Sequence, residues 1–240
     1  MKKTLWKPVF KNGGGGSRTH VRSTFISDGT LADTAPDLGA AANFLLLEEG
    51  LPQQPLSKLR PYTSQGVRGL LQAAFGLRPE DEHYDRLADR FLELYAARLC
   101  ADTRLFGGIA ELLDQLEALN LGWGIVTNKR RRFTDPLVEL LGLAPRTNCV
   151  VSGDTTAAAK PSPLPILHAC ELLGCRPERT LYVGDDKRDI VAGQAAGCQT
   201  IAVTYGYLGD SGPIETWGAD LIIDHPAQLV EFVTQRVAPK

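Results

Sequence analysis

The stretch from Phe25 to Leu38 reads "FISDGTLADTAPDL" and contains the features that decide the fold. Its first residues complete "VRSTFI", a plausible if rather polar strand, which leads directly into the turn Asp28-Gly29-Thr30. A helical pattern follows the turn. A strand, a tight turn that carries a carboxylate, and then a helix are typical of the opening of an α/β fold.

The chain from Gly108 to the C-terminus alternates between helical patterns and short apolar strands. The strand segments read "GWGIVT", "CVVSG", "TLYVGDD", "QTIAVTYG" and "ADLIID". Strands that are apolar nearly throughout, each preceded by a helix, predict a Rossmann-like parallel sheet with helices on both faces. Ligands of such sheets bind beyond the carboxyl ends of the strands, so the residues that follow each strand are the candidates for function.

A block without any strand pattern separates the opening from the alternating part. Its helical patterns span residues 37–49, 65–75 and 79–100, and the last begins with a proline and three acidic residues. We therefore expect a helical domain at residues 37–104 that is inserted into the α/β fold.

The remaining residues divide into a core and a leader. The core is expected to comprise residues 20–36 and 105–240, which is consistent with a chain of 240 residues that forms one large domain or a core with an insert. Residues 1–19 contain four consecutive glycines and no clear period, which predicts a flexible leader.

Composition narrows the class of partner. Charged residues make up 22% of the chain and the net charge is -2, which argues against nucleic acid or a membrane surface as the main partner. The five cysteines are scattered and form no CxxC pair, which predicts free thiols in a reducing compartment. No apolar run approaches the roughly 20 residues of a membrane helix, so we expect a cytoplasmic protein. No feature of the sequence specifies an oligomeric state.

Polar residues follow four of the strands. They are Asp28-Gly29-Thr30, Thr127-Asn128-Lys129, Ala159-Lys160-Pro161, and Gly184-Asp185-Asp186 with Asp189. Each loop alone has a structural explanation, but three carboxylates beside a buried strand repel one another unless a cation joins them. Together, carboxylates that hold Mg²⁺, a hydroxyl and an ammonium form the surroundings that a transferring phosphoryl group requires.

This set of motifs resembles the haloacid dehalogenase superfamily of phosphohydrolases, whose motifs read DxDGT, a strand-end T or S, a lysine, and GDxxxD. Within the superfamily the chain is similar to the phosphoglycolate phosphatase branch through "DGTLADTAPDL", "VTNK", "KPSPLPIL" and "YVGDDKRDI". The segments "YGY" and "WGAD" look closest to members that act on N-acetylmuramic acid 6-phosphate. The resemblance implies hydrolysis of a small phosphorylated metabolite with Mg²⁺ as cofactor, and a helical cap between the first two motifs.

The resemblance also implies a role for each motif residue. Asp28 would protonate the leaving oxygen and then activate water, Thr127 would hydrogen-bond the phosphoryl group, and Lys160 would neutralise its charge. Asp185 would bind Mg²⁺ directly, with help from Asp189 and from the backbone carbonyl of Asp28. The role of the adjacent Asp186 relative to Asp185 stays open at this point.

The cap would close over the site and select the substrate's leaving group. Arg68, in "SQGVRGLL", is a candidate to contact an anionic or sugar group of the substrate. A solvent-exposed helix arginine explains the same residue equally well. Asn128, next to Thr127, is a second candidate for substrate binding.

The chain departs from the family pattern at Ile26. The pattern places a carboxylate two residues before Asp28, where it attacks phosphorus and contributes to the metal site, whereas isoleucine can do neither. Ser27 is not expected to replace it, because adjacent residues of a strand point to opposite faces. Loss of a covalent nucleophile costs on the order of 10⁴ to 10⁶ in turnover, so we expect little or no phosphatase activity.

Two explanations of Ile26 compete. The chain is either a non-catalytic relative that binds phosphate and Mg²⁺, or a sequence altered by a compensated shift of reading frame. One base lost and one gained convert Phe-Asp-Leu-Asp codons into Phe-Ile-Ser-Asp codons. The second explanation is favoured, because the other motif residues are all retained.

Overall fold

The computed structural model describes residues 21–209 and 211–236, so the predicted leader lies outside the described residues. Its centre is a parallel sheet of six strands in the order β5-β4-β1-β6-β7-β8. The strands are β1 (Ser23–Ile26), β4 (Gly122–Val126), β5 (Cys149–Val151), β6 (Thr180–Gly184), β7 (Gln199–Val203) and β8 (Leu221–Ile223). The predicted Rossmann-like α/β fold is confirmed.

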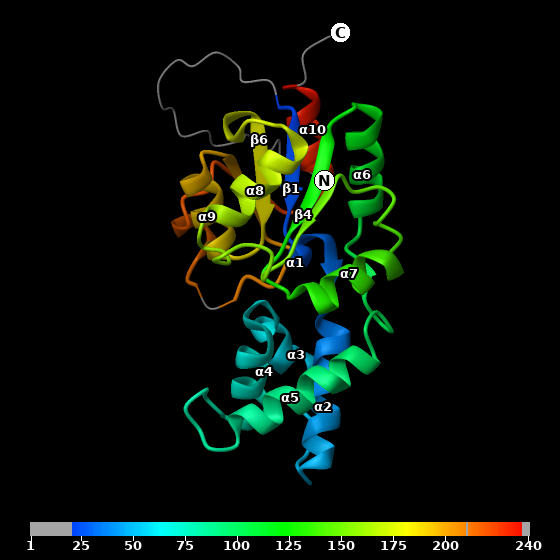
Figure 1. The fold of residues 1–240 in the computed structure, drawn as a ribbon, viewed down its shortest axis with the longest axis vertical. Helices are drawn as coiled ribbons and strands as arrows, with labels where there is room; N and C mark the ends of the chain where they lie inside the picture. The colour runs from blue at the N-terminus through cyan, green and yellow to red at the C-terminus, as the bar shows by residue number, and fades with distance from the viewer. Residues whose placement is uncertain (1–20, 210, 237–240) are drawn as a thin grey trace, which may run out of the picture.

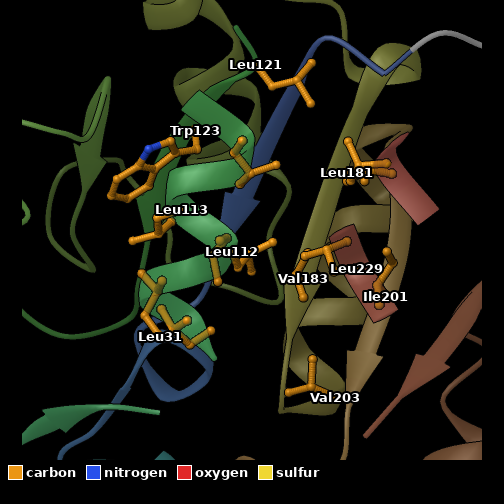
Figure 2. Packing of buried hydrophobic residues seen from close by; sticks show 14 of the residues in the cluster. Leu31, Leu112, Leu113, Leu121, Trp123, Leu181, Val183, Ile201, Val203 and Leu229 are labelled. Atoms are coloured by element: carbon orange, nitrogen blue, oxygen red, sulfur yellow. The ribbon is translucent and has the colours of Figure 1, made fainter. Parts of the chain in front are cut away.

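Helices cover both faces of this sheet (Figure 1). One face packs against α6 (Ile109–Ala118) and α10 (Pro226–Thr234), and the other packs against α8 (Leu164–Leu173) and α9 (Lys187–Ala196). Figure 2 shows side chains of the first face gathered between α6, β6 and β7, among them Leu112, Leu113, Leu181, Val183, Ile201 and Val203. Because side chains alternate along a strand, β1 contributes Ile26 to this face and Phe25 to the other.

The inserted helices form a second layer with an apolar core of its own (Figure 1). This cap consists of α2 (Ala35–Glu48), α3 (Leu56–Leu59), the 3₁₀ helix η1 (Arg60–Gln65), α4 (Gly66–Phe75) and α5 (Tyr84–Ala97). In α5 the buried residues Tyr84, Leu87, Ala88, Phe91 and Tyr95 recur at helical spacing and face α2 and α4. The cap lies beyond the carboxyl ends of the strands.

A short ribbon joins the cap to the core. The chain leaves the core through α1 (Asp28–Leu31) and β2 (Ala32–Asp33), and it returns through β3 (Arg104–Leu105), which pairs antiparallel with β2. Beyond β4, α7 (Arg131–Leu140) lies at the same end of the sheet as the cap (Figure 1). The short helices η2 (Pro177–Arg179) and η3 (Ile214–Thr216) complete the core. None of the helices in the described part of the chain is both long and apolar enough to cross a membrane.

Candidate active site

A cavity of about 630 Å³ lies between the carboxyl ends of the strands and the cap. Its volume is within the range of pockets that bind small molecules. The predicted site residues that line it are Asp28, Asn128, Lys160, Asp185 and Asp189, and Thr127 contacts it through Asp28. The cap contributes side chains from η1, α4 and α5 to the opposite wall.

Asp28 follows β1 and is held by two groups of the loop after β4. The hydroxyl of Thr127 donates a hydrogen bond to Asp28 Oδ1 at 2.6 Å, and Lys129 Nζ lies 3.5 Å from Asp28 Oδ2. Burial opposes ionisation of Asp28, but the charge of Lys129 and the bond from Thr127 outweigh it, so the pKa lies below its ordinary value. Asp28 is therefore a carboxylate at neutral pH.

Lys129 is a functional candidate that the sequence reasoning missed. Its ammonium group lies between Asp28 and the cap, because Nζ also donates to the hydroxyl of Tyr95 in α5 at 3.0 Å. Burial lowers the pKa of Lys129, but Tyr95 and Asp28 outweigh this effect and raise it. The sequence feature that could have identified Lys129 is its position two residues after Thr127, in the loop after β4.

Lys160 lies beneath the cavity floor and is 5% exposed. Its Nζ lies 2.6 Å from Asp189 Oδ1 and donates to Val126 O and to the hydroxyl of Tyr182, both at 2.8 Å. Ser27 Oγ lies 3.3 Å from the same nitrogen. These contacts fix the ammonium group at the end of the two central strands, where it can stabilise negative charge.

The loop after β6 carries three buried carboxylates with different partners. Asp186 is paired with Arg188 at 2.8 Å, and Asp189 is paired with Lys160. Asp185 instead accepts from the backbone N–H of Tyr207 at 2.9 Å and from the hydroxyl of Thr30 at 3.2 Å.

These partners explain the pKa of each carboxyl group. Burial and the charge of Asp189 raise the pKa of Asp185 to about 7. Burial also raises the pKa of Asp189, although Lys160 opposes the change. Burial acts on Asp186 too, but Arg188 outweighs it and lowers that pKa. Within the described residues Asp186 and Asp189 form ion pairs and Asp185 forms none, which favours Asp185 over Asp186 as a cation ligand.

The carboxylates of the cavity suit a cation that binds together with a phosphate group. They do not form a complete metal site made of protein side chains alone. Within residues 21–209 and 211–236, no group of three or more His, Cys, Asp or Glu side chains has an arrangement that could hold a metal ion. Mg²⁺, however, is commonly held by one or two carboxylates, with waters and substrate phosphate oxygens as the other ligands. Asp185 offers the buried carboxylate that this mode requires.

Ile26 does not face the cavity. It is fully buried in the apolar core, between its strand partners Ile125 and Val183. Ser27 lines the cavity and is 5% exposed. The alternation of the strand is as predicted: Ile26 belongs to the apolar cluster of one sheet face, whereas Ser27, the first residue after β1, lines the cavity at the strand ends.

The two predicted substrate-binding residues differ in their placement. Asn128 lines the cavity, and its side chain bonds to both backbone groups of Lys160, with N–O distances of 2.9 Å. Arg68 is exposed on α4 and lines a separate, smaller cavity with Gln72 and Arg78. The structure therefore brings Asn128 to the site and leaves Arg68 outside it.

Arg188 is a second functional candidate that the sequence reasoning missed. It lines the cavity, and its guanidinium group donates to the backbone carbonyl of Ser64 in η1 at 2.7 Å while it is paired with Asp186. The residue thus ties the acidic loop of the core to the cap. Its only signal in the sequence was a place within "GDDKRD".

Comparison with known proteins gives a family match over most of the chain. Residues 25–203 match the model of the haloacid dehalogenase-like hydrolases. The N-acetylmuramic acid 6-phosphate phosphatase of Pseudomonas putida is 42% identical over 209 residues, which cover 87% of this chain and 94% of the relative. The phosphoglycolate phosphatase of Xanthomonas campestris pv. campestris is 41% identical, with 86% and 93% covered.

A solved structure agrees with this match. A predicted phosphoglycolate phosphatase from Haemophilus somnus superposes with a TM-score of 0.79 and is 27% identical in sequence. The superposition covers 91% of this chain and 99% of the other. The similarity thus extends over both the sheet and the cap.

Proposed function

The chain belongs to the haloacid dehalogenase-like hydrolases, and we propose that it is a Mg²⁺-dependent phosphomonoester hydrolase of the phosphoglycolate phosphatase type. One observation carries the proposal. Asp28, Lys160 and Asp185 come from three separate loops and meet in one cavity at the carboxyl ends of the strands. A carboxylate for proton transfer, a buried ammonium and an uncompensated carboxylate are the groups that phosphoryl transfer needs.

The roles follow from the contacts of each side chain. Asp28, held by Thr127 and Lys129, exchanges the proton with the leaving oxygen and with water. Thr127 orients Asp28 and hydrogen-bonds the phosphoryl group. Lys160 compensates the charge of the phosphoryl oxygens from its position beneath the cavity floor.

Mg²⁺ would be held by the carboxylate of Asp185, with Asp189 orienting the site and the backbone carbonyl of Asp28 as a further oxygen donor. When bound, the ion would neutralise negative charge on the phosphoryl oxygens. Support for this assignment is the burial of Asp185, which forms no ion pair with the described residues and accepts hydrogen bonds from Tyr207 and Thr30.

The proposed substrate is a small phosphorylated metabolite, either phosphoglycolate or a phosphosugar such as N-acetylmuramic acid 6-phosphate. The names of the two relatives and the cavity volume of about 630 Å³ support this class. We further propose a cytoplasmic location and no nucleic-acid or membrane partner, in keeping with the net charge of -2.

Turnover is proposed to be impaired in this chain. The end of β1 carries no carboxylate other than Asp28, and Ile26 is part of the core. The same observation favours a second candidate function, in which the chain is a phosphate-binding and Mg²⁺-binding module that does not turn over.

Calorimetry and a hydrolysis assay test these functions together. Inorganic phosphate is titrated into the protein with and without Mg²⁺, and phosphate release is measured from phosphoglycolate, N-acetylmuramic acid 6-phosphate and a panel of sugar phosphates. The proposal predicts Mg²⁺-dependent phosphate binding, with slow hydrolysis of at least one ester.

The control is Lys160→Met, which removes the buried ammonium and should abolish phosphate binding. Tight Mg²⁺-dependent binding of an ester without any product would favour the binding module. If phosphate does not bind under any condition, both candidate functions are wrong.

A further inference from the structure

We propose that Ser27 is the phosphoryl acceptor of this chain: its hydroxyl takes the phosphoryl group of the substrate and forms a phosphoserine. The inference rests on the proposed function and adds the residue that bonds to phosphorus. It departs from the expectation that Ser27 does not replace the missing carboxylate.

The position of Ser27 is fixed by the sheet. Its backbone N–H donates to Val183 O at 3.0 Å, which continues the pairing of β1 with β6 by one residue. The strand alternation then directs Ser27 to the face of Phe25 and Tyr182, the face on which Lys160 lies. A side chain held at the end of a central strand meets a bound ligand in a constant geometry, which favours in-line attack.

The surroundings of the hydroxyl group suit a nucleophile. Ser27 Oγ lies 3.3 Å from the ammonium group of Lys160, which stabilises negative charge that develops on Oγ and on the phosphoryl oxygens. Asp28, the neighbouring residue, lines the same cavity, accepts a hydrogen bond from the Thr127 hydroxyl at 2.6 Å and lies 3.5 Å from Lys129 Nζ.

Other hydroxyl groups of the cavity lack this combination. The hydroxyl of Thr34 lies 3.4 Å from that of Tyr207, and Thr63 and Ser64 belong to η1 of the cap. Tyr95, whose hydroxyl accepts from Lys129, belongs to α5 of the cap rather than to the end of a central strand. Among the described serine and threonine residues that line the cavity, Ser27 is the one whose hydroxyl contacts a lysine. It therefore is the acceptor that the geometry selects.

The step balances without any further reactant. The bond from Ser27 Oγ to phosphorus forms while the bond from phosphorus to the leaving oxygen breaks. The hydroxyl proton passes to the Asp28 carboxylate, which delivers it to the leaving oxygen. The products are the free alcohol of the substrate and a phosphoserine.

The second step is expected to be slow. A phosphoserine is an ordinary phosphate ester, whereas the phosphoryl group on a carboxylate is an activated acyl phosphate. Hydrolysis of the intermediate therefore limits turnover, and the phosphorylated protein accumulates. This agrees with the impaired turnover proposed above.

Rapid mixing of the full-length protein with p-nitrophenyl phosphate and Mg²⁺ tests the inference. We expect a burst of about one equivalent of p-nitrophenol per protein, followed by a much slower phase. Peptide mass spectrometry should find one phosphoryl group on Ser27. Ser27→Ala should lose both the burst and the label, whereas Ser162→Ala, outside the cavity, should retain both.

Two carboxylate variants give an independent test. Ser27→Asp places an acid in the cavity and is expected to raise steady turnover by about tenfold or more, since a missing nucleophile costs orders of magnitude. Ile26→Asp buries an unpaired carboxylate in the apolar core, so it is expected to lower the melting temperature and to give no gain. A gain in Ile26→Asp with none in Ser27→Asp would overturn the inference.

The remaining outcomes distinguish a failure of the role of Ser27 from a failure of the proposed phosphatase function. Calorimetric binding of inorganic phosphate together with a label on another residue, or with no burst, overturns the role of Ser27 and leaves the proposed function standing. If inorganic phosphate does not bind, the proposed function is wrong and the inference falls with it.

Discussion

At the scale of single residues, the site is a set of buried charges that are not equally compensated. Lys160 and Asp189 form a pair whose side chains are each 3% exposed, whereas Asp185 is 2% exposed and, within the described residues, accepts hydrogen bonds from Tyr207 and Thr30 and forms no ion pair. Burying a charge without a partner costs free energy. Asp185 therefore destabilises the metal-free protein, and binding of the proposed cation would remove this destabilisation.

Replacement of Asp185 by asparagine should stabilise the metal-free protein. Asparagine can still accept from the Tyr207 N–H through its oxygen and can donate from its NH2 group to the Thr30 hydroxyl, and it removes the charge, so we expect a gain of about 1 to 2 kcal/mol in the free energy of unfolding. For a chain of this size the gain corresponds to a rise of roughly 2 to 8 °C in melting temperature. Differential scanning fluorimetry in a chelator measures the shift.

Two comparisons control this prediction. Asp186→Asn should lower the melting temperature, because it breaks the ion pair with Arg188 and removes a negative charge from the N-terminus of α9. Mg²⁺ with phosphate should stabilise the wild type but not Asp185→Asn. A metal-free Asp185→Asn protein that melts below the wild type would contradict the account of the buried charge.

At the scale of elements, the first cap helix depends on a side chain from the core. The N-cap residue of α2, Thr34, makes no side-chain capping bond. Instead, the hydroxyl of Tyr207 accepts from the backbone N–H groups of Thr34 at 2.6 Å and Ala35 at 3.0 Å, and it lies 3.0 Å from Asp33 Oδ1. The helix begins where it does because a residue that follows β7 satisfies its free donors.

Tyr207→Phe should destabilise the protein by about 1 to 3 kcal/mol, because it leaves the backbone N–H of Thr34 without its acceptor and that of Ala35 with the longer bond to Asp33 Oδ1 at 3.3 Å. Tyr205→Phe is the matched control, since the buried hydroxyl of Tyr205 has no hydrogen-bond partner among the described residues and its removal should be neutral or slightly stabilising. Urea unfolding of both variants measures the difference. Equal stability of the two variants would mean that Tyr207 does not cap α2.

At the scale of the whole molecule, cap and core share contacts on both sides of the cavity. Phe133 of α7 belongs to the apolar cluster of the cap, and its ring centroid lies 5.3 Å from that of Tyr95. Lys129 bonds to Tyr95 on the same side, and Arg188 reaches Ser64 across the cavity. Movement of the cap must break these contacts, which therefore set how readily the site opens.

Phe133→Ala should weaken the attachment of the cap. Loss of a buried aromatic side chain at this boundary is expected to cost about 2 to 4 kcal/mol. Hydrogen exchange measured by mass spectrometry should accelerate in α5 more than in the central strands β1 and β6. Leu140→Ala, on the same helix but with Leu140 62% exposed, should leave exchange unchanged. Uniform acceleration in cap and sheet would contradict a local role for Phe133.

The sequence by itself determined the order of elements and the loops that carry the site. The apolar segments "GWGIVT" and "TLYVGDD" show their strands without any knowledge of distant residues, because strand and helix periods are local properties. Parallel strands bring their carboxyl ends to one edge, so Asp28, Thr127, Lys160 and Asp185 could be assigned to one site from their positions alone.

The tertiary structure decided which side chains enter that site. The face of β1 on which the cavity opens depends on how α6 and α8 pack, so only the folded molecule assigns Ser27 to the cavity and Ile26 to the core. The hydrogen bonds from the N-terminus of α2 to the Tyr207 hydroxyl likewise join residues that lie far apart in the chain. A local sequence pattern specifies whether a segment forms a helix or a strand. The contacts of that helix or strand depend on how all the other elements pack.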